Sequence, residues 1–126
     1  MDIPAAGRPC LEEPALLVEG LDGGSGVLVW LAPGGGADTG RFAILAPTGD
    51  TAVRHARVVL RYNPGDEPHA FALDSGAVVW RREGDRAGGT VAGTGYDAVG
   101  GVRPQVQGAL RDVVIESTAV ACGAAP

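Results

Sequence analysis

The two cysteines are the residues whose placement carries the clearest chemistry. Cys10 and Cys122 stand near the two ends of the 126-residue chain, with no cysteine between them. A disulfide between them would close nearly the whole chain into one loop, which in a chain-entropy model stabilises the fold by roughly 4–5 kcal/mol. Such a bond lasts only in an oxidising compartment. We therefore predict an intramolecular disulfide, with the two Cα atoms within about 7 Å of each other.

The two histidines do not form a recognisable metal site. A zinc site needs three or four ligands at characteristic spacing, and the nearest acidic neighbours of His55 and His69 are Asp66 and Glu67. We expect both histidines to be exposed polar residues on a strand or turn, and we expect no bound metal and no cofactor.

Nucleophilic catalysis has no motif in this chain either. Ser25, Ser75 and Ser117 lie outside any Gly-x-Ser-x-Gly elbow. A triad needs its members to meet only in space, so the sequence does not decide this point by itself. We predict no catalytic residue.

Two further patterns resemble catalytic or binding motifs but lack their essential parts. Residues 88–95 are rich in glycine, yet they lack the Lys-Ser/Thr ending of a phosphate-binding loop. Adjacent carboxylates beside prolines do not supply the two acids that a glycosidase sets across a cleft, and they read as solvated turn residues: Glu12, Glu13, Asp66 and Glu67.

The two tryptophans leave two interpretations open. Trp30 and Trp80 each end an apolar run, Val-Leu-Val-Trp and Ala-Val-Val-Trp. They are either two core aromatics, packed together, or a shared aromatic floor for a ligand. In the second case Trp30, Trp80 and Arg82 form the predicted binding site, since an arginine beside an aromatic face offers stacking and a fork of donors. That site requires at least one indole partly exposed in a concavity.

These side chains must be positioned by β-strands. The chain is 45% hydrophobic with only 5% aromatic residues, and it has 21 glycines and 9 prolines. Short apolar runs alternate with turn signals about every 8–12 residues, which is typical of a β-sandwich or barrel. We predict an all-β antiparallel sandwich or flattened barrel of about eight or nine strands, in strands near residues 15–21, 26–32, 41–46, 51–62, 69–73, 77–82, 87–96, 102–110 and 113–115.

Alternation within the longest candidate strand, residues 51–62, predicts which side chains face the core. Val58, Leu60 and Tyr62 share one face and Arg57 and Arg61 the other. We expect the first three to point inward and the two arginines to point outward.

Two further features concern the C-terminal strands and the domain limits. Val102, Val106 and Leu110 share one predicted inward face, and Asp112 then breaks the alternation, which predicts a β-bulge. We expect an irregular arm over residues 1–14, a single all-β domain over 15–122 and a tail over 123–126, with adjacent termini.

The net charge and the N-terminal sequence bear on the binding partners and on the cellular location of the chain. The net charge of −5 argues against nucleic acid and against an anionic membrane surface, and no apolar run has transmembrane length. The start Met1-Asp2-Ile3-Pro4 has no secretory pattern. The chain is therefore either cytoplasmic or a secreted or cell-envelope protein whose signal has been removed; the cysteines favour the second.

One segment resembles a known group of proteins. The segment over residues 75–115 resembles small β-rich bacterial envelope lipoproteins of poorly characterised families in its turn glycines and strand starts: Ser75-Gly76, Gly84-Asp85, Gly89-Thr90, Gly100-Gly101 and Gly108-Ala109-Leu110-Arg111-Asp112-Val113. The resemblance covers about a third of the chain and implies a β-meander in an extracytoplasmic protein, with no catalytic residue. The N-terminal half does not match, and the residues before Cys10 are not a lipobox.

We expect a non-catalytic extracytoplasmic binding or structural domain. The sequence does not identify its partner; the candidates are a glycan, a small apolar ligand and another copy of the chain. One alternative is a small cyclase-like β-barrel enzyme that folds an apolar substrate inside a cavity. Another is a self-assembling surface subunit whose glycine-rich C-terminal strands pair edge to edge. An internal cavity of several hundred Å³ would favour the enzyme, and a filled core would favour the binding or structural domain.

Overall fold

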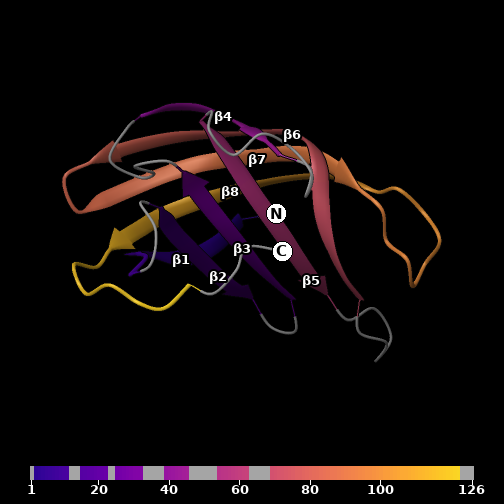
Figure 1. The fold of residues 1–126 in the computed structure, drawn as a ribbon, viewed down its shortest axis with the longest axis horizontal. Coiled ribbons are helices and arrows are strands. Elements are labelled where there is room, and N and C mark those ends of the chain that lie inside the picture. The colour runs from indigo at the N-terminus through magenta and orange to yellow at the C-terminus, as the bar shows by residue number, and fades with distance from the viewer. Residues whose placement is uncertain are drawn as a thin grey trace.

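In the computed structural model, which describes residues 2–11, 15–22, 25–32, 39–45, 54–62 and 69–122, the chain forms a closed β-barrel (Figure 1). The strands follow one another around the barrel in the order β1-β2-β3-β5-β4-β6-β7-β8, and β8 returns to β1. No helix in these ranges is long and apolar enough to cross a bilayer. The strands are β1 (Asp2–Pro9), β2 (Leu16–Asp22), β3 (Ser25–Ala32), β4 (Gly40–Ile44), β5 (His55–Tyr62), β6 (His69–Glu83), β7 (Arg86–Gly95) and β8 (Gln105–Ile115).

The predicted all-β class is confirmed, but the barrel is mixed rather than purely antiparallel. β1 runs parallel to β8, and β4 runs parallel to β5; the other neighbouring pairs are antiparallel. Parallel neighbours cannot be joined by a tight hairpin. The pairing between β1 and β8 therefore brings together the first and last strands of the chain.

The irregular arm expected over residues 1–14 is wrong for most of its length. Asp2–Pro9 is strand β1, hydrogen-bonded to β2 on one side and to β8 on the other. Its prolines suggested irregular structure, but proline is tolerated at bulges and strand ends. Pro4 lies at a register shift against β8, and Pro9 is the last residue of the strand.

The two strands predicted over residues 69–82 are one long strand. β6 continues through the expected turn at residues 74–76 because β7 pairs with it almost throughout, with one register shift between Leu73 and Ser75. Its other edge changes partner, from β5 at residues 69–72 to β4 at residues 77–80. Gly76 has a φ of 118°, and a Cβ there would collide with the backbone of Ala92. Glycine thus allows a bend within a continuous strand.

The bulge predicted at Asp112 is confirmed. Leu110 pairs with Gly89 and Val113 pairs with Ala87, so two residues of β8 stand opposite one residue of β7. Asp112 itself has a φ of 50°, a left-handed conformation that aspartate adopts more readily than most residues. The bulge restores the inward direction of Val113, which is fully buried.

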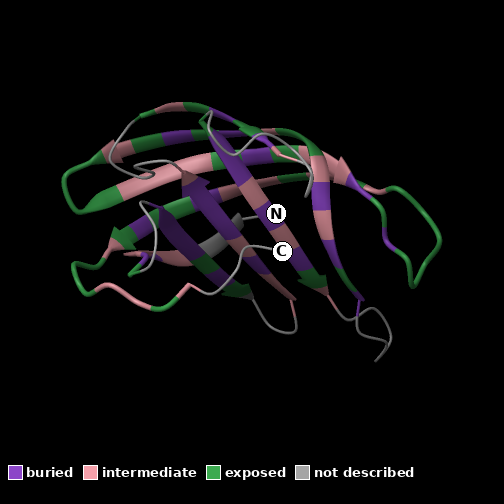
Figure 2. Cartoon of the chain, in the orientation of Figure 1, coloured by how far each residue is buried: buried purple, intermediate pink, exposed green. Residues whose placement is uncertain are grey.

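The predicted alternation in β5 is also confirmed. Val58 and Leu60 are buried in the main core and Tyr62 packs against it, whereas Arg61 is exposed and Arg57 half-exposed. Figure 2 shows the same alternation of buried and exposed positions along the strands. The core is built from aliphatic side chains with Phe42, Phe71 and Trp80 among them.

A second apolar cluster lies on the outside of the barrel, over β2 and β3. Cys10, Ala15, Leu17 and Trp30 are its buried members, with Cys122 packed against them.

The predicted disulfide is confirmed: Cys10 and Cys122 are bonded, and their Cα atoms are 5.5 Å apart. The bond therefore holds the C-terminal segment against the outer wall beside the β1–β8 pair.

We predict that replacing both cysteines, in Cys10→Ser/Cys122→Ser, lowers the free energy of unfolding by about 2–5 kcal/mol, because the open chain regains the entropy that the cross-link removes. Chemical denaturation of the oxidised wild type and the variant measures the difference. The wild type reduced with a thiol serves as the control and should match the variant. An unchanged denaturation midpoint in both would contradict a stabilising bond.

Candidate functional site

The two tryptophans do not share a surface. Trp80 is 0% exposed and belongs to the main core, whereas Trp30 is 6% exposed and belongs to the outer cluster. The barrel wall thus separates the two rings. The predicted ligand site required a partly exposed indole in a concavity, and neither ring meets that condition.

Neighbouring glycines explain how Trp80 fits inside the barrel, whereas the burial of Trp30 leaves a polar atom unpaired among the described residues. Trp80 pairs with Gly40 on one side and Gly89 on the other, and a Cβ on Gly89 would stand only 3.3 Å from the Trp80 ring. Glycine neighbours therefore leave room for a large side chain inside a narrow barrel. The indole N–H of Trp30 is buried and meets no hydrogen-bond acceptor in the described part of the chain.

Arg82, the third predicted ligand residue, contributes to local structure. Its backbone N–H donates to Thr39 Oγ1 at 3.0 Å, and its Nε donates to the carbonyl of Gly84 at 2.8 Å. The second bond closes the side chain over the turn between β6 and β7. The three predicted site residues are therefore not gathered into one exposed site.

The expectation of exposed histidines is wrong. His55 and His69 are only 6% and 8% exposed. His69, the first residue of β6, lies beside two residues that sequence reasoning did not connect with it: Tyr62, the last residue of β5, and Asp97, which follows β7. We call Tyr62, His69 and Asp97 the polar cluster.

The carboxylate of Asp97 is the centre of the polar cluster. Its Oδ2 accepts a hydrogen bond from the Tyr62 hydroxyl at 2.7 Å and lies 2.6 Å from His69 Nδ1. Its Oδ1 accepts the backbone N–H groups of Val99 at 3.1 Å and Gly100 at 3.2 Å. The carboxylate is thus surrounded by donors although its side chain is only 1% exposed.

These donors set the protonation state. The hydrogen bond from Tyr62, with those from His69 and Gly100, lowers the pKa of Asp97 to about 2, although burial acts in the opposite direction. The same hydrogen bond raises the pKa of the Tyr62 hydroxyl. Because an ionised carboxylate has no proton to give, His69 Nδ1 must be the donor in its contact with Asp97.

A carboxylate that orients a histidine is half of a general-base arrangement. The other half, a hydroxyl or thiol within hydrogen-bond reach of His69, is not found among the described residues. Ser75, the nearest serine along the chain, pairs instead with Thr94 at 2.7 Å. No group of three or more metal-ligating side chains occurs in the described ranges. The arrangement serves to hold the segment after β7 against β5 and β6.

The sequence contained only a weak signal for the polar cluster. Residues 97–101 lie between the strands predicted near 87–96 and 102–110, which indicates a turn. Asp97 does begin this turn: its carbonyl accepts the N–H of Gly101 at 2.7 Å. Nothing in the spacing indicated that its side chain turns inward. Tyr62 and Asp97 are 35 residues apart, so only the closed barrel brings them together.

A second candidate is a surface hollow of about 280 Å³ beside the β6–β7 hairpin. It is lined by two arginines and two carboxylates together with small residues: Arg81, Glu83, Arg86, Ala87, Gly88 and Asp112. The formal charges of these side chains cancel. The hollow therefore offers no net field that would select an anion or a cation.

No protein-family model, curated protein or solved structure matches the chain. The residues described above are therefore the basis for assigning it a function.

We predict that Asp97→Asn flattens the acid dependence of stability. A carboxylate whose pKa is lowered on folding stabilises the protein above its unfolded pKa of about 4. That contribution is lost as the pH falls towards the folded pKa of about 2. Chemical denaturation at pH values between 7 and 2 should show a lower stability at pH 7 for the variant and a shallower decline below pH 4.

The matched control is Asp112→Asn, which replaces an exposed carboxylate with a residue that tolerates the same positive φ. It should keep the wild-type decline. If Asp97→Asn and the wild type lose stability in parallel as the pH falls, the polar cluster does not have the assigned role.

Proposed function

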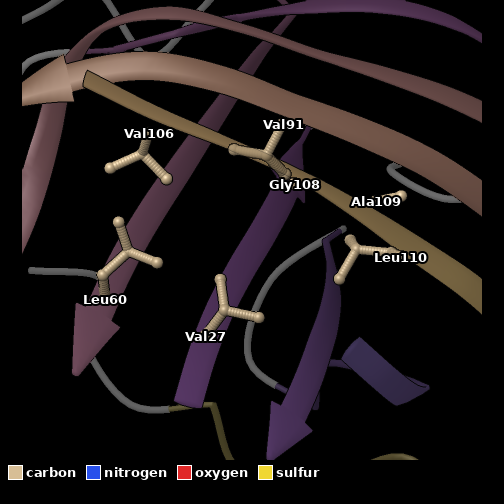
Figure 3. A pocket seen from close by; sticks show the side chains of 7 residues that line it. All are labelled: Val27, Leu60, Val91, Val106, Gly108, Ala109 and Leu110. Atoms are coloured by element: carbon tan, nitrogen blue, oxygen red, sulfur yellow. The ribbon is translucent and has the colours of Figure 1, made fainter. Parts of the chain in front are cut away.

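We propose that this chain is a non-catalytic, extracytoplasmic binding or structural domain that uses its outer surface. The observation that carries the proposal is the packed interior of the barrel, where the described residues form one continuous apolar core. The apolar cavity between β3, β5, β7 and β8 has a volume of only about 20 Å³ (Figure 3). The residues that line it come from four strands of the barrel: Val27, Leu60, Val91, Val106, Gly108, Ala109 and Leu110.

This volume weighs against the cyclase-like alternative. Small-molecule sites usually measure about 300–1,000 Å³, and a space of about 20 Å³ is on the scale of a single water molecule. An apolar substrate would have to displace core side chains to enter. The polar cluster, engaged in holding a turn, adds no support for an enzyme.

The self-assembly alternative also gains little support. It relied on free edges of the glycine-rich C-terminal strands. In the barrel β7 pairs with both β6 and β8, and β8 pairs with both β7 and β1. Most of their length is thus engaged within the chain, since β7 has partners on both edges and β8 is paired with β1 from Ala109 onward.

The disulfide supports the extracytoplasmic location, since reducing compartments do not sustain such bonds. The alternative is a cytoplasmic protein with reduced thiols. The resemblance of residues 75–115 to envelope lipoproteins agrees with the first location.

We predict that Leu60→Ala opens a ligand cavity that the wild type lacks. Removing a buried leucine should cost about 2–5 kcal/mol in chemical denaturation, and the enlarged apolar space should bind benzene. Benzene should then raise the melting temperature of the variant and leave the wild type unchanged. Arg61→Ala, which truncates an exposed neighbour, is the control and should change neither quantity. Saturable one-to-one binding of a long polyene by the wild type would favour the enzyme instead.

We predict that Cys10 and Cys122 are oxidised in the native cell. Cells are treated with a thiol-alkylating reagent before lysis, and the intact protein is weighed by mass spectrometry. The expected mass carries no added alkyl group, whereas the same sample reduced before alkylation carries two. Two alkyl groups without prior reduction would place the chain in a reducing compartment and refute this part of the proposal, while the filled barrel would be unaffected.

A further inference from the structure

The turn between β7 and β8 exposes an unusual concentration of apolar side chains. Tyr96, Val99 and Val102 are 53%, 51% and 54% exposed, and they are three of the seven large hydrophobic residues found exposed in the described ranges. Val102 was predicted to face the core, but it lies before β8 begins and is turned outward. We call residues 96–102 the apolar turn. It extends beyond the end of the barrel (Figure 1).

The apolar turn presents no charge to its surroundings. Its one charged residue, Asp97, is directed inward to Tyr62 and His69, and the side chain is 1% exposed. Asp97 is the only buried residue of the apolar turn, and its neighbours on both sides are exposed. The outward surface therefore consists of tyrosine, valine, alanine and glycine.

Five of the seven backbone N–H groups of the apolar turn donate hydrogen bonds within the turn itself. The N–H groups of Val99 and Gly100 donate to the Asp97 carboxylate, and those of Gly101 and Val102 to the Asp97 carbonyl. The N–H of Asp97 donates to the carbonyl of Val102 at 2.8 Å. N–H groups that are already paired lose no hydrogen bond to water when the turn leaves the aqueous phase, which lowers the cost of a shallow insertion.

Rigidity further lowers the cost of binding. The buried carboxylate joins the turn to β5 and β6, and Tyr62 packs edge-on against Phe71. A segment that is ordered before it binds loses little conformational entropy on binding.

We propose that the apolar turn inserts shallowly into the interface of a zwitterionic lipid bilayer and holds the barrel reversibly at that surface. Tyrosine is favoured at the boundary between headgroups and acyl chains, where its ring is apolar and its hydroxyl stays wet. The net charge of −5 disfavours an anionic surface. Arg103, at the base of the turn, is paired with Asp74 at 2.6 Å and adds little net charge.

The same observations favour a bilayer over a protein partner. A stable dimer usually buries about 800 Å² on each side, which one short turn does not provide. A protein groove normally offers hydrogen-bond acceptors to the N–H groups of a bound loop, but five of the seven N–H groups of this turn are already used within it. The proposal goes beyond the proposed function, since a binding or structural domain need not contact lipid.

The test is co-flotation of the full chain with phosphatidylcholine vesicles. The wild type should float with the vesicles, and Val99→Asp/Val102→Asp should reduce the bound fraction by at least about tenfold, because a charge in this position must be desolvated. The matched control is Val79→Asp/Val114→Asp, which changes two valines on the barrel wall that are 50% and 40% exposed. The control should bind as the wild type does. Val99→Ser/Val102→Ser replaces the aspartate variant if circular dichroism shows that the latter is unfolded.

A second measurement locates the contact. Tyr96→Trp adds an indole at the apolar turn, whereas Trp30 and Trp80 are buried. Brominated phosphatidylcholine should quench the fluorescence of the variant much more than that of the wild type. Failure of the wild type to float, equal loss in both aspartate pairs, binding only to anionic vesicles, or a concentration-dependent dimer abolished by Val99→Asp/Val102→Asp would each overturn the proposal. None of these outcomes bears on the cavity or on the cysteines.

Discussion

The parallel pairing of the first and last strands is the constraint on which the rest of the structure depends. When β1 lies between β2 and β8, every strand of the barrel has a neighbour on each side. The pair is costly to form, because the chain must bring its two ends together before any contact between them is made. The disulfide between Cys10 and Cys122 offsets part of this cost, since Cys10 follows β1 and forms a bridge with Val120 beyond β8.

Closure of the barrel also separates an inner apolar core from an outer apolar cluster. The interior is filled by aliphatic side chains and Trp80, while Trp30 and the disulfide cover the outer wall over β2 and β3. Neither tryptophan is left for a ligand. At the end of the barrel where β5 and β7 finish, Asp97 is paired inside and the turn that it supports is apolar outside.

The candidate site was less predictable than the fold, and for a physical reason. Tyr62 and His69 lie at the ends of recognisable strands, and Asp97 begins a recognisable turn, so each residue was placed correctly in its local structure. What decided their role was the pairing of β5 with β6 and of β6 with β7. A contact between residues this far apart cannot be predicted from the sequence pattern, because hydrogen bonds between side chains do not produce a periodicity along the chain.

The sequence by itself determined the features that arise from short-range physics. Period-two alternation placed Val58 and Leu60 inward, the break in phase at Asp112 marked a bulge, and two terminal cysteines indicated one cross-link. Only the tertiary structure decided that residues 2–9 form a strand and that both tryptophans are buried. It also decided that β1 pairs in parallel with β8 and β4 with β5. These outcomes depend on which distant segment supplies the hydrogen bonds and the packing, and that choice follows from closing the sheet as a whole.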